Sequence, residues 1–229
     1  NLNNHIGVPL TLLRISAEHR FAVVEMGADR AGEVAALVRI GRPTVGIITN
    51  AGAEHLEGFG SLEGVARAEG EMVAGLAPAA AAIINHDDPF ALLWKNMSAA
   101  RVFTFGLLPG ADFTADAIRT SIDESGFLTQ FTLHAPQGSV PVQLHLAGRH
   151  NLVNALGAAA AASAAGVGLA DIASGLDAMR PVPGRLQFKR AGSGAWIIDV
   201  SYNANPSSVQ AGIEVLAQLP GKRWLVFAD

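Results

Sequence analysis

The chain has 229 residues and half of them are hydrophobic, which is enough to bury the core of one large domain, or of one domain and part of another. The formal net charge of −4 and the scattered positions of the 16 lysines and arginines argue against nucleic acid and anionic membranes as partners. The absence of cysteine excludes disulfides, thiolate zinc sites and cysteine nucleophiles. Because the longest apolar window, residues 155–167, is too short to span a bilayer, we expect a soluble protein of the cytoplasm with no inserted segment.

The first half of the chain predicts an α/β fold built on a mostly parallel sheet flanked by helices. Residues 21–26 and 45–49 are continuous apolar runs, as is typical of strands buried on both faces. Residues 30–40 between them have the apolar spacing of a helix, so the three segments together predict a strand–helix–strand unit. Similar patterns predict a helix over residues 62–76 and strands over residues 81–85 and 101–105.

The second half of the chain first departs from this alternation of strands and helices and then resumes it. Alternation with turn residues predicts a small antiparallel sheet between residues 112 and 147. Helices are predicted over residues 151–165 and 169–179, and residues 181–185 have the proline and glycine content of a domain junction. Beyond this junction the patterns predict a strand over residues 195–200, a helix over residues 207–219 and a strand over residues 223–227. We therefore expect a second α/β domain to open at residue 185.

Polar residues follow the first two predicted strands. Glu25 ends the first strand, Thr49 and Asn50 end the second, and His55 comes five residues later. Ligands of open parallel sheets bind beyond the carboxyl ends of the strands, so a carboxylate, an amide and an imidazole can converge there. On general grounds a carboxylate in the position of Glu25 is more often a cap or an ion-pair partner than a metal ligand, and a lone histidine is commonly a hydrogen-bonded loop residue.

The helix predicted over residues 62–76 carries Glu69 in the middle of its apolar face. The apolar members of this face are Leu62, Val65, Ala66, Met72, Val73 and Leu76. A metal ion or a cationic partner would relieve the cost of burying Glu69, whereas a position at the rim of the helix would let it reach solvent, and both interpretations stay open. Glu63, Arg67 and Glu71 lie at i, i+4 steps on the outer face, where we expect them to pair as solvated residues.

Several common catalytic and phosphate-binding motifs are absent from the sequence. There is no G-x-x-x-x-G-K-[ST] phosphate loop, since Gly221 and Lys222 lack both the upstream glycine and the hydroxyl residue. The sequence also contains no H-x-x-x-H pair, no G-x-S-x-G elbow and no G-x-G-x-x-G fingerprint. The sequence therefore gives no indication of a zincin, an α/β-hydrolase or a dinucleotide-binding protein.

Six segments, in this order along the chain, resemble motifs of the Mur ligases. They are LNNHIGVPLTLL (2–13), VVEMGADRAGEV (23–34), ITNAGAEHLEGFGS (48–61), GRHNLVNALGAAAA (148–161), VPGRL (182–186) and DVSYNANPSSV (199–209). The resemblance implies an ATP- and Mg²⁺-dependent amide ligase of bacterial cell-wall synthesis, acting as a monomer. HLEGFGS and SYNANP resemble the members that join D-alanyl-D-alanine to UDP-N-acetylmuramoyl-tripeptide through an acyl phosphate.

The resemblance also implies a domain organisation. Mur ligases have a UDP-substrate domain, a central ATPase domain and a C-terminal Rossmann-like domain. By this comparison residues 1–184 are a central ATP-binding domain that begins just after its phosphate loop, and residues 185–229 are the beginning of the C-terminal domain. We therefore expect a fragment of a longer chain that is inactive alone.

Candidate metal and nucleotide residues follow from the same resemblance. Glu25 matches the family glutamate that holds magnesium near the γ-phosphate, and His55 matches the histidine that organises the metals and the acyl-phosphate site. Asn4 falls in a turn near the nucleotide. Glu25 and His55 are therefore expected near the phosphates of ATP, and Asn4 near the nucleotide.

The later motifs imply further contacts with ATP and the dipeptide. His150, Asn151 and Asn154 match the segment that contacts the adenine end of ATP. Arg185 matches the hinge arginine that reaches the phosphates when the third domain closes. The remaining candidates, in the loop expected to face the dipeptide and the nucleotide, are Asn203 and Asn205.

Two positions depart from the family pattern. Glu69 stands where most relatives carry a lysine that becomes a carbamylated metal ligand, so we keep Glu69 as a metal and catalytic candidate with a shorter stem. Val200 stands at the second aspartate of the DDSYNAN pattern. Asp199 remains as a candidate nucleotide contact, although strand alternation turns Asp199 and Val200 to opposite faces.

Two alternatives to an active ligase stay open. A degenerate relative could keep the fold and nucleotide binding without catalysis; Glu69 and Val200 favour this alternative, and the intact motif residues argue against it. A different amide ligase of the superfamily, such as a folylpolyglutamate synthase, is disfavoured by HLEGFGS.

Overall fold

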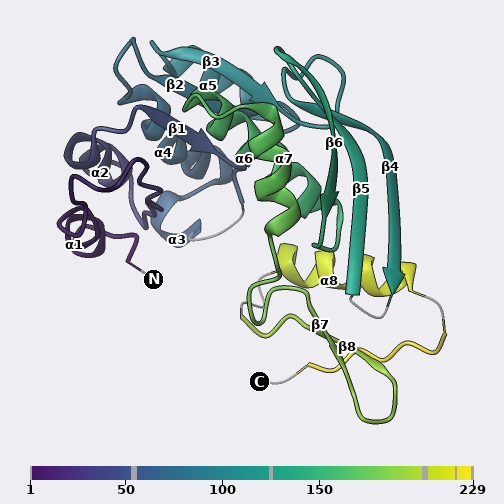
Figure 1. Ribbon diagram of the computed structural model, residues 1–229. Helices are drawn as coiled ribbons and strands as arrows, with labels where there is room; N and C mark the ends of the chain where they lie inside the picture. The colour runs from purple at the N-terminus through teal and green to yellow at the C-terminus, as the bar shows by residue number, and fades with distance from the viewer. Residues whose placement is uncertain (1, 53–55, 124–125, 203–205, 220, 228–229) are drawn as a thin grey trace.

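The structure is a computed structural model that describes residues 2–52, 56–123, 126–202, 206–219 and 221–227. Its first half contains α1 (Gly7–Leu12), α2 (Glu33–Gly41), β1 (Val45–Ile48), α3 (Leu56–Phe59), α4 (Leu62–Ala74), β2 (Ala81–Asn85), α5 (Ala91–Met97) and β3 (Arg101–Phe105). Its second half contains β4 (Thr114–Asp123), β5 (Gly126–Ala135), β6 (Gly138–Leu144), α6 (Arg149–Ala164), α7 (Leu169–Ala178), β7 (Gln187–Arg190), β8 (Trp196–Asp199) and α8 (Pro206–Gln218). The predicted α/β class is confirmed, with a parallel sheet flanked by helices and a separate antiparallel sheet (Figure 1).

The parallel sheet has the strand order β1-β2-β3 and a helical layer on each face. Neighbouring residues of β2 face opposite sides, so Ile83 packs with α6 while Ala82 and Ile84 pack with α4 and α5. Trp94 of α5 is fully buried and donates a hydrogen bond from Nε1 to the carbonyl oxygen of Ala66 at 2.7 Å. This bond ties α5 to α4 and satisfies the polar atom of a buried indole.

The start of α2 is capped by a side chain of α4. Glu71 accepts hydrogen bonds from the backbone nitrogens of Gly32 at 2.7 Å and Ala35 at 3.0 Å. The prediction that Glu71 is a solvated residue of the outer face is therefore wrong, because the unpaired N–H groups at the start of α2 use its carboxylate. Glu63 and Arg67 do form the predicted pair on that face, at 2.7 Å.

The antiparallel sheet has the order β4-β5-β6, and one of its faces packs on α6 and α7. Its register shifts between Asp116 and Arg119, and Ala117 in this interval has a φ of 50°. This irregularity in β4 resembles a β-bulge, a common feature of strands at the edge of a sheet.

The chain after residue 186 forms an antiparallel hairpin of β7 and β8 with α8 beside it, at the bottom of Figure 1. The predicted helices over residues 151–165 and 169–179 are α6 and α7, the predicted strand over residues 195–200 is β8, and the predicted helix over residues 207–219 is α8. However, β7, which pairs antiparallel with β8, was not predicted, and the last strand of the predicted strand–helix–strand unit, residues 223–227, is not formed.

Two predicted strands are not formed. Residues 21–26 and 223–227 belong to no strand, and several of their apolar side chains are exposed, Val23 by 99% and Val226 by 87%. A strand needs a neighbour that accepts and donates its ladder hydrogen bonds, and no strand in the described residues offers one to either segment. Instead, Gly27 donates a backbone hydrogen bond to Asn3 at 2.9 Å.

None of the helices in the described part of the chain combines the length and the apolar content needed to cross a bilayer.

Candidate functional site

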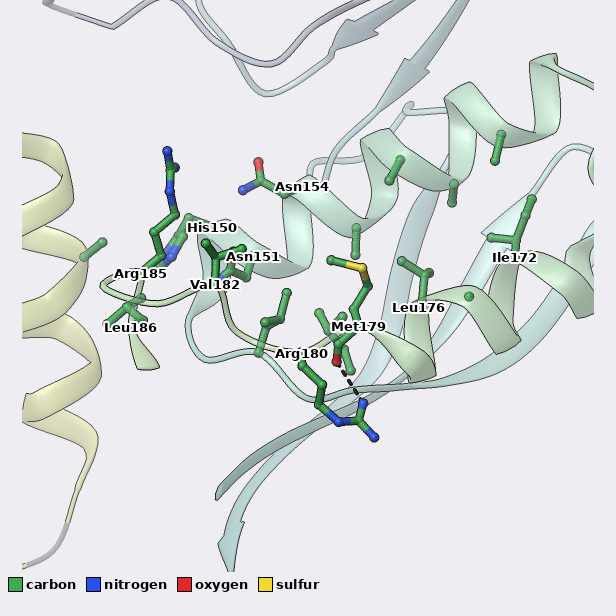
Figure 2. Close-up of a pocket in the computed structure, with 18 of the residues that line it drawn as sticks. His150, Asn151, Asn154, Ile172, Leu176, Met179, Arg180, Val182, Arg185 and Leu186 are labelled. Carbon is green, nitrogen blue, oxygen red and sulfur yellow. Dashed lines mark hydrogen bonds between the residues drawn. The ribbon is translucent and has the colours of Figure 1, made fainter. Parts of the chain in front are cut away.

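A cleft of about 940 Å³ opens between α6, α7, α8 and the segment that joins α7 to β7 (Figure 2). Its apolar wall consists of Leu144, Leu146, Ala155, Ala158, Ala159, Ala162, Val167, Ile172, Leu176, Met179, Val182, Leu186, Val200 and Ala211. Its polar lining consists of Asn50, His150, Asn151, Asn154, Asp171, Arg180, Arg185, Tyr202 and Ser208. A largely apolar cleft with a few polar groups is the usual form of a small-molecule site.

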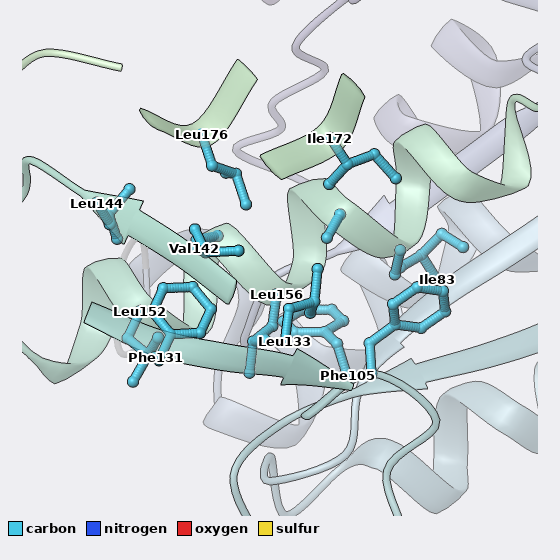
Figure 3. Packing of buried hydrophobic residues seen from close by; sticks show 14 of the residues in the cluster. Ile83, Phe105, Phe131, Leu133, Val142, Leu144, Leu152, Leu156, Ile172 and Leu176 are labelled. Atoms are coloured by element: carbon cyan, nitrogen blue, oxygen red, sulfur yellow. The ribbon is translucent and has the colours of Figure 1, made fainter. Parts of the chain in front are cut away.

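The part of the apolar wall formed by β6, α6 and α7 is the outer surface of the main hydrophobic core (Figure 3), whereas Leu186 and Val200 belong to a separate cluster. Ile172 and Leu176 of α7 belong to both, and behind them Leu156 and Phe105 are fully buried. The wall is therefore held by close packing between α6, α7 and the two sheets, and it presents a fixed apolar surface.

His150 lies in the first turn of α6, where a glycine makes room for its ring. Gly148 has a φ of 89°, and a Cβ built at this position would lie 2.5 Å from Cε1 of His150. Burial lowers the pKa of His150, and the negative charge of Glu214 opposes this effect only in part. At neutral pH the imidazole is therefore neutral, with one nitrogen that donates and one that accepts.

Asn151 and Asn154 have different roles although both line the cleft. Asn151 donates a hydrogen bond from Nδ2 to the carbonyl oxygen of Ala147 at 2.7 Å, so its amide holds the loop before α6. Asn154 is exposed one turn later, and within the described residues its amide has no hydrogen-bond partner. Because it lies four residues after His150, the two side chains share one face of the helix.

A tight turn presents Arg185 to the cleft. The backbone nitrogen of Arg185 donates to the carbonyl oxygen of Val182 at 3.0 Å, with Pro183 and Gly184 at the centre of the turn. Gly184 has a φ of 75°, which matches a type II turn with proline first and glycine second. No carboxylate of the described residues forms an ion pair with Arg185. Its guanidinium is therefore available to an anionic ligand.

The two arginines of the cleft point in different directions. In Figure 2 the guanidinium of Arg185 and the amide of Asn154 lie on the same side, whereas Arg180 points the opposite way. Arg180 donates from one guanidinium nitrogen to the carbonyl oxygens of Asp177 at 2.6 Å and Met179 at 2.9 Å. Arg180 thus closes the end of α7, and Arg185 is the arginine that faces the polar part of the cleft.

Val200 and Asp199 face different surroundings, as strand alternation predicts. Val200 lines the cleft and packs with Gly212 of α8. Asp199 is not among the lining residues: Lys189 donates to its Oδ2 at 2.6 Å, and Ser201 donates to its Oδ1 from Oγ at 2.7 Å. The lysine and the serine lower the pKa of Asp199 to about 2. The carboxylate of Asp199 therefore joins β7 to β8 and does not replace an acid at position 200.

The carboxyl end of the parallel sheet is organised by residues that the sequence analysis did not single out. Asn85 donates from Nδ2 to the carbonyl oxygen of Thr49 at 2.7 Å, and Asp88 accepts from the backbone nitrogen of Ala51 at 3.0 Å. These bonds hold the chain on both sides of Asn50, which lines the cleft. In the sequence, these residues belong to the polar cluster NHDDP (85–89), which directly follows a buried strand. Polar side chains at such positions commonly fix backbone turns.

The candidates near the N-terminus lie outside the cleft. Asn4 accepts hydrogen bonds at Oδ1 from the backbone nitrogens of Ile6 at 3.1 Å and Gly7 at 2.9 Å, so its side chain caps the start of α1. Glu25 is exposed and accepts a hydrogen bond from Nδ2 of Asn3 at 2.8 Å. Glu69 is half-buried on α4. The cleft therefore brings the later motifs together with Asn50, and Asn4, Glu25 and Glu69 are not among its lining residues.

The predicted metal set cannot be assembled from the described residues. His55, like Asn203 and Asn205, lies outside them. Among the residues that are described, no group of three or more histidine or acidic side chains is arranged to hold a metal. Glu25 and Glu69 do offer the carboxylate oxygens that Mg²⁺ prefers.

Comparison with known proteins identifies the family. Residues 1–162 match the family model of the Mur ligase middle domain. The chain belongs to the Mur ligase family. Among the described residues, the matched region carries His150, Asn151, Asn154 and the part of the cleft wall formed by α6 and β6, while α7, Arg185 and the rest of the wall follow it.

Several relatives of this Mur ligase chain carry the same name. The UDP-N-acetylmuramoyl-tripeptide–D-alanyl-D-alanine ligase of Escherichia coli is 46% identical over 233 residues, which cover 100% of this chain and 50% of that protein. A crystal structure of MurF from Acinetobacter baumannii matches with a TM-score of 0.91 at 38% identity, over 97% of this chain and 48% of that one. A structure of MurF from Thermotoga maritima in complex with ADP matches with a TM-score of 0.82 at 28% identity, over 97% and 50%. The chain thus spans about half the length of the curated relatives it matches.

Proposed function

We propose that this chain supplies the ATP-binding part of a ligase that joins D-alanyl-D-alanine to UDP-N-acetylmuramoyl-tripeptide. The Escherichia coli relative is named for this reaction, and the Thermotoga maritima relative is described in complex with ADP. The observation that carries the proposal is the cleft, where an amide, a neutral imidazole and a guanidinium without an acidic partner border an apolar wall.

The cleft has the chemistry that a nucleotide needs. Two small side chains of α6 that are not fully buried, Ala158 and Ala162, offer an apolar surface to a base. Asn154 and His150 provide donors and acceptors for its polar edge. Arg185 provides a cation with several donors in a fixed plane, which suits phosphate oxygens. Asn151 contributes indirectly, because it fixes the loop before α6.

In the proposed reaction the γ-phosphoryl group of ATP passes to the terminal carboxylate of the tripeptide, which gives an acyl phosphate and ADP. The amine of D-alanyl-D-alanine then attacks the acyl carbon, phosphate leaves and an amide bond forms. The transferring group carries negative charge on its oxygens, so a positioned guanidinium such as that of Arg185 stabilises the transition state. Asn203 and Asn205 are proposed to face the dipeptide and the nucleotide.

We assign the metal-binding role to Glu25, His55 and Glu69. A bound Mg²⁺ would supply positive charge to the phosphate oxygens at the transition state. Glu69 would take the place of a carbamylated lysine, but its side chain is shorter. We therefore propose that a second metal binds weakly or in a displaced position. We further propose that residues 1–184 form the central ATP-binding domain, that residues 185–229 open the C-terminal domain, and that the enzyme acts as a monomer in the cytoplasm.

The proposal is tested with the complete gene product. The protein is incubated with ATP, Mg²⁺, UDP-N-acetylmuramoyl-tripeptide and D-alanyl-D-alanine, and the amide product is measured by mass spectrometry while each substrate is omitted in turn. We expect product only when all of them are present. A folded protein that binds ATP but forms no product under these conditions would contradict the ligase function.

One observation favours a second candidate, a relative that binds nucleotide without catalysis. Val200 places an apolar side chain in the lining of the cleft, and Asp199, which could offer an acid instead, is bound to Lys189 and Ser201. Nucleotide binding without product in the experiment above would favour this candidate.

A further inference from the structure

The ring of Tyr202 lies beneath the guanidinium of Arg185. The Cζ atom of Arg185 is 4.1 Å from the centre of the Tyr202 ring, well within the range of a cation–π contact. Tyr202 follows β8, whereas Arg185 precedes β7, so the contact joins the two ends of the hairpin. Both residues line the cleft.

The backbone around Tyr202 is anchored on two sides. Its backbone nitrogen donates to the carbonyl oxygen of Gly184 at 3.1 Å, which holds it against the turn that carries Arg185. A Cβ at position 184 would lie 3.0 Å from this nitrogen, so glycine is needed for the close approach. On the other side, Ser201 is bound to Asp199, and Asp199 is bound to Lys189 of β7. The ring therefore projects from a fixed backbone.

The side chain of Arg185 has few other restraints. Within the described residues it has no ion pair and no side-chain hydrogen bond. An arginine in solvent loses considerable rotamer freedom when it binds a ligand, and prior restraint lowers that cost. The Tyr202 ring is the described group that provides such restraint.

We propose that Tyr202 is a positioning residue that holds the guanidinium of Arg185 toward the cleft for the phosphates of the bound nucleotide. The inference rests on the proposed function, because it takes the nucleotide as the ligand. Tyr202 itself acts through Arg185, and its hydroxyl is not required. Loss of the ring should therefore weaken the binding of ligands that carry phosphates, such as ATP, and should not change the binding of adenosine.

Equilibrium binding of ATP and of adenosine to the full chain tests this proposal. The variants are Tyr202→Leu, which removes the ring, Tyr202→Phe, which keeps it, and Arg185→Gln. Arg190→Gln is a matched control, because Arg190 lies over Trp196 at 5.2 Å and outside the residues that line the cleft. Tyr202 is 55% exposed, so its removal leaves the core intact.

We expect Tyr202→Leu to weaken ATP binding by about 3- to 10-fold and to leave adenosine binding unchanged. Tyr202→Phe should bind ATP as the unmodified chain does, and Tyr202→Leu should have little further effect once Arg185 is Gln. Unchanged ATP binding in Tyr202→Leu would overturn the proposal. Equal losses for ATP and adenosine would overturn it too, since they would indicate a structural role.

A second measurement separates this proposal from the proposed function. The order of the Arg185 guanidinium is measured by ¹⁵N relaxation of its Nε–H group without nucleotide. We expect the order to fall in Tyr202→Leu and to be kept in Tyr202→Phe; equal order in all forms would overturn the positioning role. Since Tyr202 is the single tyrosine of the chain, one ¹⁹F signal after fluorotyrosine labelling reports on its ring. A complete gene product that binds neither ATP nor adenosine would contradict the proposed function, whatever the relaxation data show.

Discussion

Asn151 and Ala147 are joined by a hydrogen bond of 2.7 Å from the side-chain amide to the backbone carbonyl oxygen. Asn154, one turn further along α6, has no such bond among the described residues. Two asparagines of one motif therefore differ in their contacts: the amide of the first is used by the fold, and we propose that the amide of the second contacts the nucleotide.

This difference is testable with one substitution at each asparagine. Asn154→Ala should weaken ATP binding about 10-fold, as expected for the loss of a polar contact with a ligand, and should not change the free energy of unfolding. Asn151→Ala should lower the free energy of unfolding by about 1–2 kcal/mol, because the buried carbonyl of Ala147 loses its partner. Calorimetric titration and urea denaturation measure the two effects. A loss of stability in Asn154→Ala, with ATP binding unchanged, would contradict the assignment.

The cap on α2 gives a prediction about stability alone. Glu71→Ala should lower the free energy of unfolding by about 1–2 kcal/mol, since the backbone nitrogens of Gly32 and Ala35 lose their acceptor at a helix N-terminus. The matched control is Glu63→Ala on the same helix, whose exposed pair with Arg67 is worth about 0.5 kcal/mol or less. Chemical denaturation of both variants decides the matter, and equal losses would show that Glu71 is not a cap.

Asp199 gives a prediction about pH. Its folded-state pKa of about 2 lies below the ordinary value, so the ionised carboxylate stabilises the hairpin at neutral pH. This contribution is lost as the pH falls from about 4 to about 2. Lys189→Met removes the largest cause of the shift and should raise the pKa of Asp199, whereas Lys222→Met should not. The ¹³C signal of the carboxyl group measures the titration; an ordinary Asp199 pKa in the unmodified chain would refute the ion pair.

The elements that could be predicted from the sequence are those whose hydrophobic periodicity lies entirely within the element itself. The buried strands β2 and β3 and the amphipathic helix α4 carry their periodicity within a short stretch of sequence. The runs over residues 21–26 and 223–227 have the same composition, but a strand also depends on a partner elsewhere, and local composition does not report whether that partner is present. The strand β7 was missed because its mixed sequence, QFKR, gives no clear alternation.

The same distinction applies to the site. His150, Asn154 and Arg185 could be named from motifs, and the structure places all of them in one cleft. The contacts that organise the cleft join residues far apart in the sequence, such as Tyr202 with Arg185 and Asn85 with Thr49. No pattern along the chain gives such pairs, because they depend on how the elements pack.

The proposed role of Glu69 is tested by lengthening its side chain. Glu69→Lys offers an amine that can be carbamylated in bicarbonate buffer, which would carry the negative oxygens further from the helix. We expect Mg²⁺ to bind more tightly to this variant than to the unmodified chain in the presence of ATP, as measured by competition with Mn²⁺ in electron paramagnetic resonance. Glu63→Lys on the outer face of α4 is the control. No gain in metal affinity or in activity for Glu69→Lys would count against the substitution hypothesis.

The most direct test of the central claim, that the cleft holds the nucleotide, is a crystal structure of the chain with ADP bound. We expect the base against the alanines of α6 beside Asn154 and His150, and the phosphates directed to Arg185. ADP bound outside the cleft, or an empty cleft at a concentration that saturates binding in solution, would contradict this claim.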